Sequence, residues 1–192
     1  MIDTQQVKEL REKTGVSIMQ CRKALEEAGG DMKKAEIILQ KQGQSIAEKK
    51  SGRTLGAGAI QAYIHSTGAV GAMVELLCET DFVSKNETFK NLARDLAMQI
   101  TATNPTYLKR EDIPESAQNE AKEVLKQEVL DKPADLQEKI LSGKLDSYFS
   151  DKILLEQSFI KDQDLSVKDL IDSAVQKFGE KIEIGHFTRF SI

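Results

Sequence analysis

Two cysteines and two histidines are all that the 192-residue sequence offers for thiol or imidazole chemistry. Cys21 and Cys78 lie far apart and follow no CxxC or Cys/His spacing, which argues against a disulfide framework and against a zinc site. His65 and His186 fall in separate predicted strands, and no HExxH or GxSxG motif surrounds them. We therefore expect no metal, no cofactor and no enzymatic chemistry of the chain's own.

A long apolar segment is also missing. No apolar run approaches the roughly 18 residues that a membrane helix needs, and the first residues, MIDTQQVKELREK, lack the apolar stretch of a secretory signal. The hydrophobic fraction of 40% and the charged fraction of 30% are typical of a soluble globular protein. We expect a cytoplasmic protein with reduced thiols and no membrane partner.

The sequence has no basic excess either. Its net charge of −4 argues against direct binding of nucleic acid. The charge is uneven, because residues 1–54 carry eleven Lys or Arg against eight Asp or Glu, and residues 55–192 carry sixteen against twenty-three. The basic part could contact an acidic partner, although a solvated surface is the simpler explanation.

A phosphate-binding loop is absent as well. Gly56-Ala57-Gly58 looks like a fragment of a glycine-rich loop, but it precedes a predicted strand instead of a helix. A third glycine at the required spacing and a Gly-Lys-Ser/Thr sequence are both missing. The chain therefore has no nucleotide cradle of its own.

What the sequence does contain begins with three short helices before about residue 43. Capping residues mark where each helix begins, glycines mark where each ends, and apolar residues recur at helical spacing between them. We expect residues 1–45 to form a three-helix binding module, residues 46–58 a polar linker and residues 59–192 an α+β core. The caps are Asp3, Ser17 and Asp31, the stops are Gly15, Gly29-Gly30 and Gly43, and the inward stripe of the second helix is Ile18, Cys21, Leu25 and Ala28.

The core is predicted to hold a small antiparallel sheet packed with helices. Alternating apolar residues indicate a β-hairpin of residues 59–64 and 70–78 and a closing strand over 182–190. Helices should run from a capping box at Ser84 to Asn104, and from Ser166 to Gly179. Between them, helices that open at Pro114 and at Pro133, the second ending at Gly143, should form a protruding antiparallel hairpin. The apolar stretch 145–160 has no clear period and stays unassigned.

A short turn between the second strand and the next helix is the most distinctive feature. Thr80, Asp81, Phe82 and Val83 place a carboxylate and an aromatic ring between two regular elements, where functional loops are often found. Phe82 could equally tuck into the core beneath the turn, and the residues alone leave both possibilities open.

Two long stretches resemble the signatures of the elongation factor Ts family. One runs from Leu10 to Leu25 (LREKTGVSIMQCRKAL) and the other from Glu75 to Lys85 (ELLCETDFVSK). The order of the remaining elements is also similar, including DKPADLQEKILSGKL over 131–145. The family usually has Lys in place of Arg22 and Asn in place of Leu77. With room for one core module, the chain resembles the short form of the family, which is associated with homodimers.

The resemblance implies a guanine-nucleotide exchange factor that binds elongation factor Tu in its GDP form. A ubiquitin-associated-like N-terminal module would dock on the GTPase domain, with Arg11, Arg22 and Lys23 as candidate contacts. The turn of Thr80 to Val83 would intrude beside the nucleotide and displace Mg²⁺ from the partner. A homodimer, for which the apolar stretch 145–160 is a candidate interface, would give a 2:2 complex.

Two other functions remain open from the residues. The first 43 residues could belong to an adaptor that binds a helical or ubiquitin-like protein without exchange activity. A cysteine hydrolase that uses Cys78 is disfavoured, because no base partner is evident.

Overall fold

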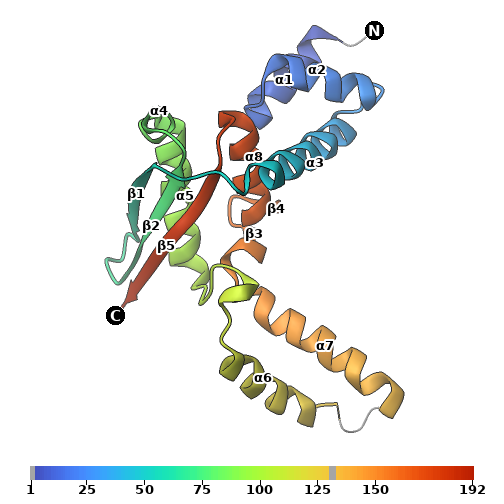
Figure 1. Cartoon of the computed structure of the whole chain (residues 1–192), viewed down its shortest axis with the longest axis vertical. Helices are drawn as coiled ribbons and strands as arrows, with labels where there is room; N and C mark the ends of the chain where they lie inside the picture. The colour runs from blue at the N-terminus through green and yellow to red at the C-terminus, as the bar shows by residue number, and fades with distance from the viewer. Residues whose placement is uncertain (1–2, 130–132) are drawn as a thin grey trace.

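The computed structural model describes residues 3–129 and 133–192, without the side chains of residues 134 and 135. Helices surround a small antiparallel sheet, so the predicted α+β class is confirmed. Figure 1 shows the N-terminal helices and a helical hairpin projecting from opposite ends of the body that holds the sheet. In the described part of the chain, none of the helices has the length and apolar character needed to cross a membrane.

The N-terminal helices begin where the sequence predicts. They are α1 (Thr4–Thr14), α2 (Ile18–Glu27) and α3 (Met32–Lys50). Their N-cap side chains accept hydrogen bonds from backbone N–H groups in the first turn, as capping requires. The caps are Asp3, Ser17 and Asp31. These helices share a small core that includes Leu10, Val16, Cys21, Leu25, Ala35 and Leu39.

Ile18 is a correction to the predicted stripe of α2. Its side chain is 57% exposed, whereas Val16, which precedes the N-cap, is buried in the core of the three helices. The helical period alone placed Ile18 with Cys21 and Leu25, but position 18 is the first residue of the helix and lies at the edge of that core. An isoleucine is therefore left facing solvent.

The predicted end of the third helix at Gly43 is wrong, because α3 continues to Lys50. Gly43 is buried against α8 (Val167–Phe178), and a Cβ at this position would lie 3.2 Å from the backbone oxygen of Asp172. Packing against α8 thus outweighs the weak helix propensity of glycine. Residues 46–50, which the sequence placed in a polar linker, are helical; the division into domains stays a prediction.

The sheet forms as predicted. It contains β1 (Ala57–Ile64), β2 (Val70–Cys78) and β5 (Ile182–Ser191), all antiparallel, in the order β1-β2-β5. One face packs on α5 (Glu87–Thr103) and α8, and its core includes Val74, Leu76, Phe89, Leu96, Ile100, Val175 and Ile182. Among the described residues, no helix lies over the other face (Figure 1).

The junction between β2 and α5 differs from the prediction. Ser84 does not cap α5; it ends a one-turn helix, α4 (Asp81–Ser84), and its hydroxyl donates to the backbone oxygen of Asp81. Asn86 is the N-cap of α5, and its side chain accepts from the N–H of Thr88 at 2.8 Å. Two capping-capable residues lie within three positions, so the local pattern could not separate them. The predicted stop at Asn104 is correct.

The projecting hairpin consists of α6 (Glu115–Gln127) and α7 (Ala134–Ser150). The helix α7 does not end at the predicted Gly143. It continues to Ser150, because Leu145 and Phe149 in its C-terminal part pack against neighbouring residues. Residues 131 and 132 of the stretch that resembles the family lie outside the described residues. The chain then passes through η2 (Leu154–Glu156), β3 (Ser158–Phe159) and β4 (Asp162–Ser166) to α8, which has the predicted Ser166–Asp169 capping box and Gly179 stop.

Most of the large apolar side chains of the stretch 145–160 turn out to be interior, although Tyr148 is 43% exposed. Phe149, Ile153, Leu154 and Phe159 are buried within the chain. Gln157, in the same stretch, is buried and hydrogen bonded to Gln99 of α5. Since these side chains are already covered by the protein itself, the stretch is not an available apolar surface.

Candidate functional site

The four predicted turn residues lie on and just before α4, at one end of the sheet (Figure 1). Thr80 is the N-cap and Asp81 the first helical residue. Phe82 is 83% exposed, so the alternative in which it fills the core is wrong. Val83 is 4% exposed and belongs to the main core. One side of α4 therefore anchors it and the other presents an aromatic ring to solvent.

Glu180 supports the start of α4 from a segment 100 residues away. Its Oε1 accepts from the Thr80 hydroxyl at 2.6 Å and its Oε2 accepts from the Thr80 N–H at 3.0 Å. Nothing in the sequence pattern pointed to Glu180, because the contact arises only when β5 pairs beside β2. Glu180 directly follows Gly179, which ends α8 in a left-handed conformation.

Glu79 ties the same region to the segment before β1. Its carboxylate accepts from the backbone N–H of Lys181 at 2.6 Å and from the Arg53 guanidinium at 3.2 Å. The hydrogen bond from Lys181 lowers the pKa of Glu79, and Arg53 lowers it further. Glu79 thus stays ionised at neutral pH and links three chain segments below α4.

Cys78 is a structural residue in this arrangement. It is fully buried, and its Sγ–H donates to the backbone oxygen of Thr80 at 3.2 Å. Burial raises the pKa of the Cys78 thiol, and the nearby charge of Glu180 raises it further. A protonated thiol is a poor nucleophile, so these surroundings do not favour a hydrolase.

Asp81 faces solvent and pairs with Lys85 one turn later. Its Oδ2 lies 2.6 Å from Lys85 Nζ, and both side chains are largely exposed. The hydrogen bond and charge of Lys85 lower the pKa of Asp81. The carboxylate is therefore ionised at neutral pH, beside the exposed ring of Phe82.

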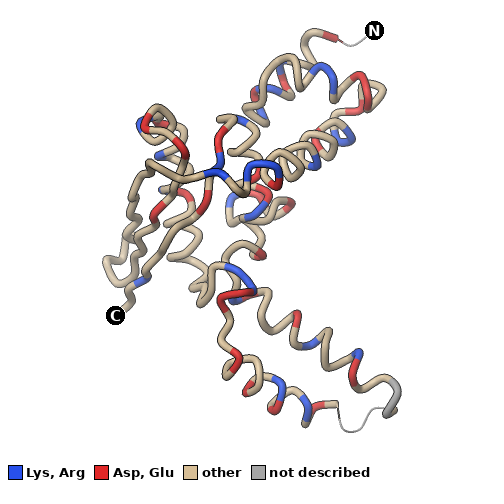
Figure 2. The backbone as a smooth tube through the Cα atoms, viewed as in Figure 1, with Lys and Arg blue, Asp and Glu red and all other residues tan. Residues whose placement is uncertain are grey.

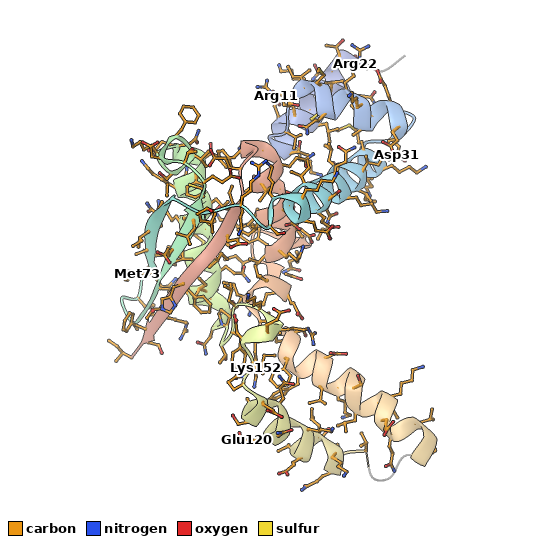
Figure 3. The ribbon with its side chains drawn as sticks, in the orientation of Figure 1. Arg11, Arg22, Asp31, Met73, Glu120 and Lys152 are labelled. Carbon is orange, nitrogen blue, oxygen red and sulfur yellow. The ribbon has the colours of Figure 1, made fainter. Side chains whose placement is uncertain are left out.

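The N-terminal candidates lie on the outer part of the three-helix module. Figure 3 places Arg11 and Arg22 on neighbouring helices there, and Arg22 pairs with Glu26 at 3.0 Å. Ile18 and Met19, with exposed fractions of 57% and 68%, project from the same helix as Arg22 and Lys23. Spacings of three and four residues put these four side chains on one helical face. Met19 was not singled out from the sequence.

The N-terminal module and α4 lie at the same end of the molecule, opposite the α6–α7 hairpin (Figure 1). Their relative position is fixed through α3, whose second half packs on α8. Gln44 donates to Asp169 at 3.1 Å, and Lys50 donates to the backbone oxygen of Gly179 at 2.6 Å. The structure thus presents both predicted sites from one packed framework.

A further exposed surface lies on the uncovered face of the sheet. The strands carry few charges compared with the helices (Figure 2), although strand register places Glu75, Glu183 and His186 on this face beside its apolar residues. We call it the open sheet face; its large apolar side chains are Ile60, Ile64, Met73 and Phe190, which are 49–71% exposed. Strand register places Ile64 and Phe190 on either side of Gly71, and Figure 3 shows Met73 beside the same strands.

Comparison with known proteins identifies the family of the chain. The family model for elongation factor Ts matches residues 17–192. Elongation factor Ts of Carboxydothermus hydrogenoformans is 48% identical over all of this chain and 89% of the relative. The proteins of the same name from Thermotoga petrophila (48%, covering 97% of this chain and 94% of the relative) and Thermodesulfovibrio yellowstonii (49%, 100% and 96%) are equally similar. The chain therefore belongs to the elongation factor Ts family of translation elongation factors.

Proposed function

We propose that this protein is a guanine-nucleotide exchange factor that binds elongation factor Tu·GDP and promotes release of GDP. Phe82 is the ring that enters the partner beside the nucleotide, Asp81 accompanies it as a charged contact, and Thr80 and Val83 form the base of the wedge. The observation that carries the proposal is the exposure of Phe82 on a helical turn that is anchored on its other side.

An exposed phenylalanine contributes little to folding, because its ring stays in water. Transfer of that ring into an apolar pocket of a partner is worth about 1.5–3 kcal/mol. Exchange requires that this energy be coupled to nucleotide binding, so that the factor and GDP each weaken the affinity for the other. Since about 1.4 kcal/mol corresponds to a tenfold change in affinity, Phe82 accounts for roughly one to two decades.

A larger effect needs a second contact, and the α2 face of the N-terminal module can supply it. Ile18 and Met19 provide apolar area, while Arg22 and Lys23 provide positive charge at its border. Such a face suits a helix of the GTPase domain with apolar and acidic side chains. Arg11 on α1 extends the positive border. This contact would hold the complex while α4 acts at the nucleotide.

Displacement of Mg²⁺ from the partner can be tested separately from binding. If α4 acts through the metal, chelation with EDTA should raise the spontaneous rate of GDP release and shrink the acceleration that the factor adds. An equal fold acceleration with and without EDTA would show that α4 acts on the nucleotide by another route.

The homodimer is proposed to form through the open sheet face and not through residues 145–160, because most of the large apolar side chains of that stretch are buried. An apolar patch around a two-fold axis can cover itself with the same patch of a second copy, as two packed sheets do. Light scattering should report a dimer at micromolar concentration, and Ile64→Lys with Phe190→Lys should give a monomer. A monomeric wild-type protein would contradict this part of the proposal.

The main test is release of fluorescent GDP from elongation factor Tu. The wild-type protein should accelerate release at stoichiometric concentration, and no acceleration would contradict the proposal. Tyr148→Ala serves as a control, because it removes another part-exposed aromatic ring, in the last turn of α7 and away from α4.

A further inference from the structure

The pairing between β2 and β5 does not stop where its backbone ladder ends. The last backbone pair is Cys78 with Ile182. In the next two positions, side-chain carboxylates take over as acceptors: Glu79 accepts from the N–H of Lys181, and Glu180 accepts from the N–H of Thr80. The two strands therefore hold each other reciprocally, and this pairing extends to the first residue before α4.

Glu180 makes a second hydrogen bond to Thr80 in addition to the one from the backbone N–H. Its other carboxylate oxygen accepts from the Thr80 hydroxyl at 2.6 Å. Thr80 is the N-cap of α4, yet its side chain makes no capping bond to the helix. The hydroxyl is instead directed out of the helix, toward Glu180. Both donors of Thr80 thus end on one carboxylate.

A helix of four residues has too few hydrogen bonds to be stable alone, because helix nucleation costs more than one turn returns. Its position must come from tertiary contacts. In α4 these include the buried side chain of Val83 after Phe82, and the Glu180 carboxylate and the Cys78 thiol on Thr80 before it.

We propose that Glu180 is a positioning residue for exchange: it fixes the start of α4 so that Phe82 is already oriented before the partner binds. The inference rests on the proposed function of Phe82. A turn that is ordered in advance does not lose conformational freedom on binding, so more of the interaction energy is available to weaken nucleotide affinity. Without the carboxylate, Val83 and the hydrogen bond from Cys78 to the Thr80 backbone oxygen still hold α4, but the N–H and hydroxyl of Thr80 lose their acceptor and Phe82 gains freedom.

Three substitutions separate the two bonds. Glu180→Gln keeps the size of the side chain but leaves one acceptor oxygen for two donors. Thr80→Val removes only the hydroxyl, and Thr80→Ser restores it. Glu183→Gln is the matched control, since the same chemical change is made on β5 at a carboxylate that pairs with Lys181 Nζ and not with Thr80.

The experiment has two readouts. The first is GDP release from elongation factor Tu over a range of factor concentrations, which gives a maximal rate and a half-saturating concentration. Glu180→Gln should lower the maximal rate about three- to tenfold and change the half-saturating concentration by less than about twofold. Thr80→Val should give part of this loss and Thr80→Ser should recover most of what Thr80→Val loses, whereas Glu183→Gln should behave like wild type.

The second readout needs no partner. Because the sequence contains no tryptophan, Phe82→Trp introduces a single indole that reports the motion of α4 by time-resolved fluorescence anisotropy. Adding Glu180→Gln to this background should increase the amplitude of fast local motion, and adding Glu183→Gln should not.

The outcomes distinguish failure of the proposed exchange function from failure of the positioning role of Glu180. If the wild type does not accelerate GDP release, the exchange function fails, and the anisotropy alone decides whether Glu180 holds α4. If the wild type is active and Glu180→Gln matches it in both maximal rate and anisotropy, the positioning role is overturned. If Glu180→Gln fails to fold, a Thr80→Val variant that equals Thr80→Ser in both readouts overturns it instead.

Discussion

Phe82 and Val83 are adjacent residues with opposite environments: Phe82 is 83% exposed and Val83 is 4% exposed. Both belong to the single turn of α4. Val83 packs in the main core with residues of the sheet, α5 and α8, so the ring of Phe82 is carried by a buried anchor. This division separates residues that keep the turn in place from the residue that meets a partner.

The division predicts that two neighbouring truncations act differently. Phe82→Ala should change the free energy of unfolding by less than about 0.5 kcal/mol, because an exposed ring contributes little to the fold. It should lower the maximal rate of GDP release about tenfold to hundredfold. Urea denaturation and stopped-flow release of fluorescent GDP measure the two effects.

Val83→Ala should show the reverse order of effects. Removing two buried methyl groups should destabilise the protein by about 1–3 kcal/mol. The maximal rate of GDP release should fall less than in Phe82→Ala, because the ring is still present and only its position on α4 becomes less fixed. Equal loss of stability in the two variants would mean that the ring of Phe82 is part of the fold and not a contact surface.

The N-terminal face should act on affinity. Ile18→Glu combined with Met19→Glu places two charges on the exposed face of α2 and should raise the half-saturating concentration for elongation factor Tu at least tenfold, because burying unpaired charge is costly. The maximal rate should change much less. Val124→Glu is the control, an exposed apolar residue on α6. An unchanged half-saturating concentration for the α2 variant would exclude this face from the interface.

Gly43 should determine how the N-terminal module is held. A side chain here would meet the backbone of Asp172 and the side chain of Gln176, which leave no room between α3 and α8. Gly43→Leu should therefore destabilise the protein by about 1–3 kcal/mol through overpacking. Gly52→Leu is the control, because nothing lies within 4 Å of a Cβ at that position. A neutral Gly43→Leu in thermal denaturation would show that α3 does not pack closely on α8.

The environment of Asp169 predicts that the free energy of unfolding falls at acidic pH. Burial alone would raise the pKa of its carboxyl, but hydrogen bonds from Ser166, Gln40 and Gln44 outweigh this and lower it. A carboxyl whose pKa is lowered by folding stabilises the folded protein at pH values above its pKa in the unfolded chain, which is near 3.9. That contribution is lost as the pH falls from about 4 through the lower folded-state value.

Asp169→Asn should therefore cost about 1 kcal/mol at pH 7, where the wild type has its capping box. The difference between variant and wild type should shrink as the pH falls below 4. Urea titrations at pH 7 and pH 3 measure it, and a difference that stays constant across this range would contradict the role given to the Asp169 charge.

Helix ends and strands were predictable where the deciding chemistry is local. Asp3, Ser17, Asp31 and Ser166 cap helices through bonds within three residues, and Gly15 and Gly179 end helices in the left-handed region. The alternation of apolar and polar residues along β1 and β2 also indicates which side chains face the core. These features need no knowledge of distant parts of the chain.

One error was local, because Asn86, which caps α5, offers the same capping chemistry as Ser84 two residues earlier. Other errors arose where tertiary packing decides. Gly43 continues a helix because α8 lies against it, and Ile18 is exposed because the helical period does not show where the core of the module ends. Glu180 could not be found, since its partner Thr80 is 100 residues away. Phe82 was placed on the right turn, but only the structure shows that its ring faces solvent.

The most direct test of the account compares wild type, Phe82→Ala and Tyr148→Ala in stopped-flow release of fluorescent GDP from elongation factor Tu, at saturating concentrations of each factor. We predict fast release with wild type and with Tyr148→Ala, and release about tenfold to hundredfold slower with Phe82→Ala. A Phe82→Ala variant that releases GDP as fast as wild type would contradict the account.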